Sequence, residues 1–312
     1  MKPSLLDDKN KEIERELKSV PRLWRNPLAR YAKSYSAASG GFEGVRIGRK
    51  RDGSIERVRW SGREGKALLL LAEYKALQKA SHEYLVSLRW VGKQNERFYV
   101  ATSWLDLEPR TDWPIPIRTL LGQMECAARG VAALHKQGLV HGDLKPETIL
   151  WDGDRAIVTD FKLAAPAGRR EHAFYSPKFA APEQILEESV GPEADVYALG
   201  VTLYTLFIRE RFPNLVKTQE TSAKSGNDVG LSAETEFSKL NEAPAHRGQG
   251  LVVGAKVLFR RRLSSVVDGV RDANLIGSVL EIVRRACELD PSKRYTDAAA
   301  MADALRELRA QS

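Results

Sequence analysis

Two acidic residues and a lysine lie in stretches of the sequence where they could do chemistry. Asp143 and Lys145 lie two positions apart in the stretch "HGDLKPETIL", and Asp160 ends the β-like run "AIVTD". A carboxylate can accept a proton, a lysine ammonium can steady a negative charge, and carboxylate oxygens are the ligands that a hard cation such as Mg²⁺ prefers. The surrounding motifs decide which of these uses applies.

Five short motifs occur in a fixed order along the chain. They are "LVHGDLKPETIL", "IVTDFKLA", "KFAAPEQI", "ADVYALGVTLY" and "LDPSKRYTDA". Any one of them could arise by chance, but the ordered set could hardly do so. With these motifs the chain, from about residue 38 to 308, resembles the eukaryotic-type (Hanks-type) Ser/Thr protein kinases that are also common in bacteria. The resemblance implies an α+β fold in two lobes, a small β-rich lobe with one main helix (αC) and a large mainly helical lobe, with a nucleotide cleft between them.

The resemblance also implies roles in phosphoryl transfer, where catalysis is mostly positioning and charge neutralisation. Asp143 would accept the proton of a substrate hydroxyl, Lys145 would steady the transferred phosphoryl group, and Asp160 would hold Mg²⁺. Lys145 together with Ser176 matches the Ser/Thr subclass. The implied cofactors are ATP and Mg²⁺.

Three further residues match structural positions of the family. By the resemblance, Glu183 of "APE" pairs with Arg294 of "DPSKRY", which ties the activation segment to the large lobe. Asp195 would hydrogen-bond the backbone of the catalytic loop. We expect these residues to hold the fold rather than to take part in chemistry.

The small lobe matches the family less closely. Glu73 fits the αC glutamate, and aligning "GSIERVR" with the family's strand puts Arg59 where a phosphate-binding lysine belongs. Lys66 is a poorer candidate, because it lies only seven residues before Glu73. Arginine keeps the charge but has a bulkier planar head, so it is no simple substitute for an ammonium.

Two more stretches correspond to nucleotide-binding parts of the family. "SGGFEGV" stands in place of the glycine-rich loop without its regular spacing, and Gly40, Gly41 and Gly44 could still let the backbone approach phosphate. "ATSWL" stands in place of the hinge that contacts adenine, which assigns Ser103 and Leu105 to the nucleotide site.

The sequence departs from the family at three more positions. Thr148 replaces the asparagine that would hold a second metal ion, and its hydroxyl sits on a shorter, β-branched arm. Lys162 replaces the glycine of Asp-Phe-Gly, where it either brings charge to the phosphates or fills their site. Gly142 replaces the arginine that commonly reads a phosphate on the activation loop.

These departures leave two main hypotheses open. The leading one is a degenerate, pseudokinase-like member that acts through a protein partner, with Thr148, Lys162 and Arg59 weakening the handling of metal and phosphate. The alternative is an active, atypical Ser/Thr kinase that transfers the γ-phosphate of ATP to protein hydroxyls. A pure scaffold is a third class. Small-molecule phosphotransferases share "HGD" but lack the "APE" and "DPxxRY" motifs, which disfavours them.

The elements that must position these residues follow from periodicity. Short strands are expected at 44–48, 55–60, 85–92 and 97–104, a helix at 65–80, and a longer helix at 118–138 that stops at a glycine. The predicted organisation is a basic N-terminal extension (1–37), the N-lobe (38–105) and the C-lobe (106–312). A polar stretch at 214–250 reads as a flexible insertion in the C-lobe.

Composition sets the broad class. The 312 residues are 43% hydrophobic and 29% charged, which fits a globular protein and excludes collagen-like and disulfide-rich classes. The two cysteines, Cys126 and Cys287, lie in apolar helical patterns, so we expect buried thiols and a cytoplasmic location.

The apolar run 196–208 is too short to cross a bilayer. The formal charge of +8 lies in the first third of the chain, but no nucleic-acid motif accompanies it. We therefore expect a protein partner or substrate and neither membrane nor nucleic acid.

Overall fold

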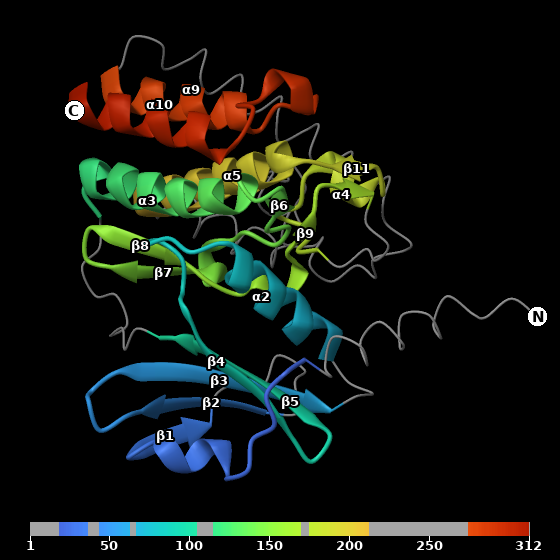
Figure 1. Cartoon of the computed structure of the whole chain (residues 1–312). Coiled ribbons are helices and arrows are strands. Elements are labelled where there is room, and N and C mark those ends of the chain that lie inside the picture. The colour runs from blue at the N-terminus through green and yellow to red at the C-terminus, as the bar shows by residue number, and fades with distance from the viewer. Residues whose placement is uncertain are drawn as a thin grey trace, which may run out of the picture. The chain divides into compact units, whose positions relative to one another are not determined.

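The computed structural model describes residues 19–36, 44–62, 67–104, 115–169, 175–211 and 274–311. The chain divides into two compact units, which can be followed in Figure 1 by residue number along its colour bar. Unit 1 comprises Met1–Asp106 together with Asp160–Ala164, and unit 2 comprises Leu107–Thr159 and Ala165–Ser312. Most of the predicted extension and all of the predicted insertion lie outside the described residues.

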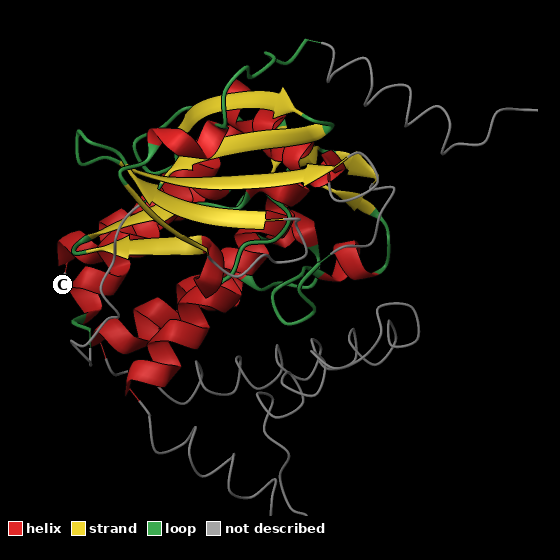
Figure 2. Cartoon of the chain, turned by 90° about the horizontal axis from the view of Figure 1, so that it is seen from below, coloured by secondary structure: helices red, strands yellow, loops and turns green. Residues whose placement is uncertain are grey.

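Unit 1 is built on an antiparallel five-stranded sheet in the order β1-β2-β3-β5-β4. The strands are β1 (Lys33–Ser36), β2 (Gly44–Arg49), β3 (Ile55–Gly62), β4 (Leu88–Gln94) and β5 (Arg97–Ser103). β2 and β3 are joined by a tight turn, in which Gly53 has a φ of 85°. Figure 2 shows the strands of this sheet fanned by their twist.

One face of this sheet is covered by helix α2 (Ala67–Lys79). The core between them contains Val45 and Val100 from the sheet and Leu70 and Leu71 from the helix. On α2, Leu70, Glu73 and Leu77 recur at helical spacing and are all buried, so the glutamate lies on the inward side of the helix.

The opposite face of the sheet is covered by the segment before β1. Leu23, Leu28 and Tyr31 pack against a cluster centred on Val58 and Tyr99. The segment includes the short 3₁₀ helix η1 (Pro27–Arg30) and continues into the edge strand β1. Residues 20–36, expected as an extension in front of the domain, therefore complete the sheet and its outer core.

Unit 2 is mainly helical. Helices α3 (Ile117–His135), α5 (Pro192–Arg211), α9 (Asn274–Ala286) and α10 (Ala298–Gln311) pack together, with α3 against α10 and α5 against α9 (Figure 1). The shortest helices are α4 (Pro182–Ile185) and the 3₁₀ turns η2 (Pro146–Thr148) and η4 (Pro291–Lys293). Cys126 and Cys287 are both buried free thiols, which confirms that expectation.

Short strands in unit 2 lie next to the loops that contain the kinase-like motifs. The predicted β-like runs form the hairpin β7 (Ile149–Asp152) and β8 (Arg155–Val158). Two-residue pairs join β6 (Leu139–Val140) to β9 (Ala165–Pro166) and β10 (Gly168–Arg169) to β11 (Ser189–Val190). Two-residue strands have no periodicity of their own, so the sequence did not predict them.

Within the part of the chain that the structure describes, none of the helices has both the length and the apolar character needed to cross a membrane.

Candidate functional site

Arg59 and Glu73 form a buried ion pair inside unit 1. Arg59 lies on β3 opposite Val45 and Val100, whose side chains belong to the core beneath α2. Its side chain therefore faces α2, where Nη2 donates to Oε1 of Glu73. Both residues are buried, at 4% and 0% exposed. The aligned strand thus places arginine, and not lysine, at the partner position of the α2 glutamate.

Asp160 brings a second carboxylate to the same arginine. It adopts a left-handed backbone conformation (φ 71°, ψ 56°) immediately before the 3₁₀ turn η3 (Phe161–Leu163), which belongs to unit 1 and packs against α2. Asp160 Oδ1 accepts from Arg59 Nη1 at 2.6 Å. Asp160 Oδ2 accepts from Lys162 Nζ at 2.7 Å. Both oxygens of this carboxylate therefore hold protein cations.

Lys162 fits its position without backbone strain. A lysine in place of glycine costs most where the backbone needs a positive φ. Among the described residues with side chains, positive φ occurs at Asn95, Glu96, Asp160 and Glu187, and not at Lys162. Phe161, fully buried, anchors the turn and directs Lys162 back toward Asp160.

The charges of this cluster shift the pKa values of its members. Burial, together with the nearby charge of Arg57, lowers the pKa of Arg59 to about 9 against the opposing pull of Asp160. Burial alone would raise the pKa of Asp160, but the charges of Arg59 and Lys162 outweigh it and hold that pKa well below its usual range. Asp160 is therefore ionised throughout the physiological range.

The arrangement around Asp160 does not fit a magnesium ion. Mg²⁺ requires oxygen ligands at about 2.0–2.1 Å in near-octahedral geometry. Both Asp160 oxygens already accept from cationic groups, at 2.6 and 2.7 Å. Among the described residues there is also no group of three or more His, Cys, Asp or Glu side chains arranged to hold a metal. Asp160 in this arrangement is therefore a poor ligand for Mg²⁺.

In unit 2, Asp143, Lys145 and Ser176 form a closed set of hydrogen bonds. Lys145 Nζ donates to Asp143 Oδ2 at 3.0 Å and to Ser176 Oγ at 2.7 Å. Ser176 Oγ in turn donates to Asp143 Oδ1 at 2.6 Å. The carboxylate thus accepts from a hydroxyl, and the ammonium lies beside the same hydroxyl oxygen, which is the geometry a proton-accepting Asp and a steadying Lys require.

Asp195 holds the loop that carries Asp143 through hydrogen bonds to its backbone. Asp195 Oδ2 accepts from the backbone of His141 at 2.7 Å, and Oδ1 accepts from the backbone of Gly142 at 2.9 Å. The predicted contact of Asp195 with the catalytic loop is confirmed. Burial opposes ionisation of Asp195, but its bonds and the nearby histidines hold its pKa below the usual value. His135 lies 3.0 Å from Asp195 Oδ2 through Nε2, while its Nδ1 accepts from the backbone of Ala298.

Gly142 suits its place in this loop. Its φ is 78°, a conformation that glycine adopts without cost. Its carbonyl accepts from Gln184 Nε2 at 3.0 Å, and Gln184 Oε1 accepts from the backbone of Ala181. The glycine that replaces the family's arginine is therefore integrated into the fold.

Thr148 is engaged in its own turn. Its buried hydroxyl accepts from the backbone N–H of Lys145 at 3.1 Å and lies 3.0 Å from the carbonyl oxygen of the same residue. The backbone of Thr159 donates to the carbonyl of Thr148, which joins this turn to the end of β8. Its assignment as a metal ligand stays a prediction.

Glu183 and Arg294 form the predicted buried ion pair. The guanidinium binds the carboxylate through two parallel bonds, Nη1 to Oε1 at 2.7 Å and Nη2 to Oε2 at 2.9 Å. Arg294 also donates to the carbonyls of Glu288, Leu289 and Glu193. This pair holds α4 to the segment that precedes α10.

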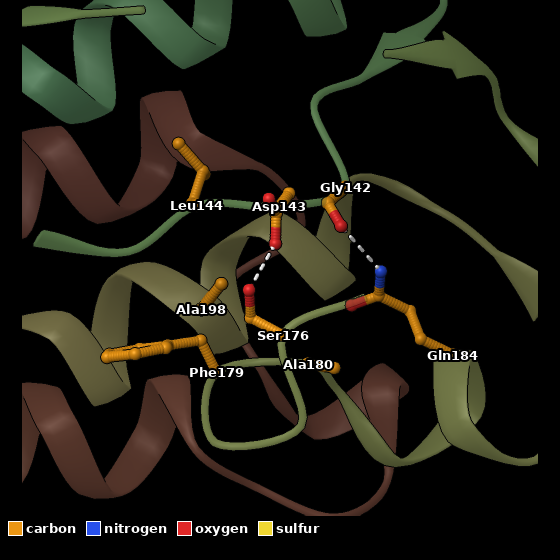
Figure 3. A pocket seen from close by; sticks show the side chains of 8 residues that line it. All are labelled: Gly142, Asp143, Leu144, Ser176, Phe179, Ala180, Gln184 and Ala198. Carbon is orange, nitrogen blue, oxygen red and sulfur yellow. Dashed lines mark hydrogen bonds between the residues drawn. The ribbon is translucent and has the colours of Figure 1, made fainter. Parts of the chain in front are cut away.

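A small hollow adjoins the Asp143 loop (Figure 3). Its lining residues are Gly142, Asp143, Leu144, Ser176, Phe179, Ala180, Gln184 and Ala198. The two dashed bonds in the figure, Ser176 to Asp143 and Gln184 to Gly142, tie the segment 176–184 to the loop. The sequence matched Ser176 to the Ser/Thr subclass but did not predict its hydrogen bond to Asp143. The two residues lie 33 positions apart, so only the folded structure brings them together.

The remaining predicted nucleotide-site residues are only partly described. Gly40, Gly41 and Leu105 lie outside the described residues. Gly44 begins β2, where a Cβ would collide with the indole of Trp60, so packing alone requires a glycine there. Ser103 ends β5, and its hydroxyl accepts from the backbone of Ser87 at 2.9 Å. Ligand binding by these residues stays a prediction.

Comparison with known proteins identifies the family. The family model for the protein kinase domain matches residues 54–306, so the chain belongs to the protein kinase family. The expected fold is confirmed, with unit 1 as the β-rich lobe and unit 2 as the helical lobe. Members of this family bind ATP and Mg²⁺ and act on protein substrates.

The similar proteins include serine/threonine-protein kinases. Pkn1 of Myxococcus xanthus is 28% identical over 249 residues, which cover 75% of this chain and 31% of Pkn1. PknL of Mycobacterium tuberculosis is 25% identical over 301 residues, covering 89% of this chain and 66% of PknL. The chain spans less than two thirds of the length of both relatives. It is therefore a Ser/Thr protein kinase-like domain.

Proposed function

We propose that this kinase-like domain has impaired phosphoryl transfer and acts by binding a protein partner, as a pseudokinase. The observation that carries the proposal is the state of Asp160, the residue aligned with the family's metal ligand. Arg59 and Lys162 occupy both of its oxygens. Because a metal ion would have to bind beside these two cations and compete with them for the carboxylate, the usual neutralisation of phosphate charge by Mg²⁺ is weakened.

Two further observations support this proposal. Arg59 stands in place of the phosphate-binding lysine, and its guanidinium binds two carboxylates, those of Glu73 and Asp160. The hydroxyl of Thr148, in place of the second metal-binding residue, is bonded within its own turn. The departures thus gather on the handling of metal and phosphate, while the fold around them is retained.

An active, atypical Ser/Thr kinase that transfers the γ-phosphate of ATP is the second candidate. It is favoured by the intact arrangement in unit 2. Ser176 Oγ donates to Asp143 at 2.6 Å and accepts from Lys145 at 2.7 Å, so the groups expected to receive a substrate hydroxyl are poised to do so. The pseudokinase would bind a protein partner and the active kinase would act on a protein substrate, and a cytoplasmic location belongs to both candidates.

Radiolabelled phosphate transfer separates the two candidates. The purified domain is incubated with γ-labelled ATP and Mg²⁺ or Mn²⁺, alone and with a generic protein substrate, beside Asp143→Ala. The pseudokinase proposal expects no incorporation above that variant, and expects an Asp143→Ala allele to complement a gene deletion in the source organism. Robust incorporation that Asp143→Ala abolishes would refute it and establish the active kinase.

A further inference from the structure

The cluster around Asp160 carries its own cation where the family uses a metal ion. Lys162 Nζ lies 2.7 Å from Asp160 Oδ2, and Arg59 Nη1 lies 2.6 Å from Oδ1. Each oxygen of Asp160 thus already uses one of its lone pairs on a protein cation. A divalent ion at either oxygen would enter at about 2.1 Å beside an ammonium and a guanidinium. The positive charge of these two groups opposes Mg²⁺ at this position.

The cluster as a whole has an excess of positive charge. The charges of Arg57, Arg59 and Lys162 act on Asp160, while Glu73 adds the second carboxylate. Among the described residues of this cluster, three cations thus surround two carboxylates, and this mainly positive environment favours an anion.

Lys162 is more accessible to a ligand than Asp160 and Arg59. Its side chain is 28% exposed, against 17% for Asp160 and 4% for Arg59. A lysine ammonium is a compact point charge on a flexible stem and is well suited to phosphate. The turn η3 and its bond to Asp160 hold Lys162 in place, so little order has to be gained on binding.

We infer that Lys162 is a resident cation that replaces the divalent metal at Asp160, and that this cluster binds the polyphosphate chain of a nucleoside triphosphate without Mg²⁺. The inference rests on the kinase-like function proposed above, because that function names the nucleotide. It differs from that proposal in concerning binding rather than transfer. It therefore predicts a metal dependence opposite to that of the family, in which metal ions bridge the phosphates.

The test is nucleotide binding with and without metal. Fluorescent mant-ATP is titrated into the purified domain in EDTA and in millimolar Mg²⁺. We expect binding in EDTA that is at least as tight as in Mg²⁺, because metal-free ATP carries more negative charge. Binding that requires Mg²⁺, or no binding in either buffer, would overturn the inference.

Variants of Lys162 assign the effect to this side chain. Lys162→Gly, which restores the family residue, should weaken binding in EDTA by about tenfold or more and make Mg²⁺ favourable. Lys162→Arg should keep metal-free binding. Lys79→Gln, at an exposed lysine at the end of α2, is the matched control and should change nothing. Unchanged EDTA binding by a folded Lys162→Gly, judged by its thermal melting curve, would contradict the role of Lys162.

Two further measurements test whether the metal is excluded and whether the ligand is a nucleotide. With ATP present, Mn²⁺ electron paramagnetic resonance should detect bound metal in Lys162→Gly and not in the wild type. Bound Mn²⁺ in the wild type would overturn the inference. Competition with inorganic tripolyphosphate tells a nucleotide site from one for inorganic polyphosphate. Displacement of mant-ATP by tripolyphosphate that is weaker than by ATP supports the nucleotide, whereas equal displacement, or none by tripolyphosphate, overturns the inference.

Failure of this inference and failure of the proposed function give different results. Phosphate transfer sensitive to Asp143→Ala would refute the pseudokinase even if nucleotide binding were independent of metal. Absence of nucleotide binding would refute the inference and leave the pseudokinase standing.

Discussion

Replacing Arg294 by methionine should destabilise unit 2 by several kcal/mol. Arg294 and Glu183 have side-chain exposures of 0% and 5%, and two bonds of 2.7 and 2.9 Å join them. The variant removes those bonds and three more to backbone carbonyls, and it leaves the carboxylate of Glu183 buried without its counterion. Removing one member of a buried pair costs about 3–5 kcal/mol.

Urea unfolding followed by circular dichroism measures this loss. For a domain of this size, each kcal/mol shifts the melting temperature by about 2–4 °C, so we expect a fall of about 10 °C. Glu183→Gln with Arg294→Met should be more stable than Arg294→Met alone, because no buried charge remains without a partner. A loss below about 1 kcal/mol for Arg294→Met, or no recovery in the double variant, would refute the argument from burial.

Three further predictions concern other parts of the two units. Arg59→Lys should destabilise unit 1 by about 1–3 kcal/mol, because a single ammonium cannot span two carboxylates as the guanidinium fork does, and thermal melting will show it. Asp195→Asn should cost about 1–3 kcal/mol at neutral pH, because an amide cannot accept both backbone N–H groups. Since folding lowers the pKa of Asp195, its contribution is present above the unfolded carboxyl pKa and disappears as the pH falls through the folded value, so the loss should shrink in acid urea titrations. Gly44→Ala should cost about 1–3 kcal/mol and alter tryptophan fluorescence, because its Cβ meets the indole of Trp60; unchanged fluorescence would contradict that packing.

Much of the fold was predictable because its signals are local. Strands were expected at 44–48 and 55–60 and a helix at 65–80, and the structure has β2, β3 and α2 there. The pairing of Glu183 with Arg294 followed from motifs and needed no geometry. Segment 20–36 was harder, because its cover of the outer sheet depends on single apolar residues such as Leu23 and Tyr31 in an otherwise basic stretch.

The candidate site was predicted in its members but not in its contacts. The alignment put Arg59 opposite Glu73, yet it could not show that the same guanidinium also binds Asp160, 101 residues further on. The direction of Lys162 was equally hidden, since a lysine in a turn can point to solvent or back to its own backbone. Such contacts depend on tertiary placement, which composition and spacing do not encode.

The two substitutions at Arg59 and Lys162 are best understood together. A guanidinium can bridge Glu73 and Asp160, and once it holds one oxygen of Asp160, the other oxygen is the remaining place for a counterion. Lys162 fills that place from two residues away at 2.7 Å. Restoring only the glycine would leave Arg59 on Asp160, so full metal binding should require both Lys162→Gly and Arg59→Lys. A double variant that gains no more affinity for Mn²⁺ than Lys162→Gly alone would show that Arg59 does not contribute to excluding the metal.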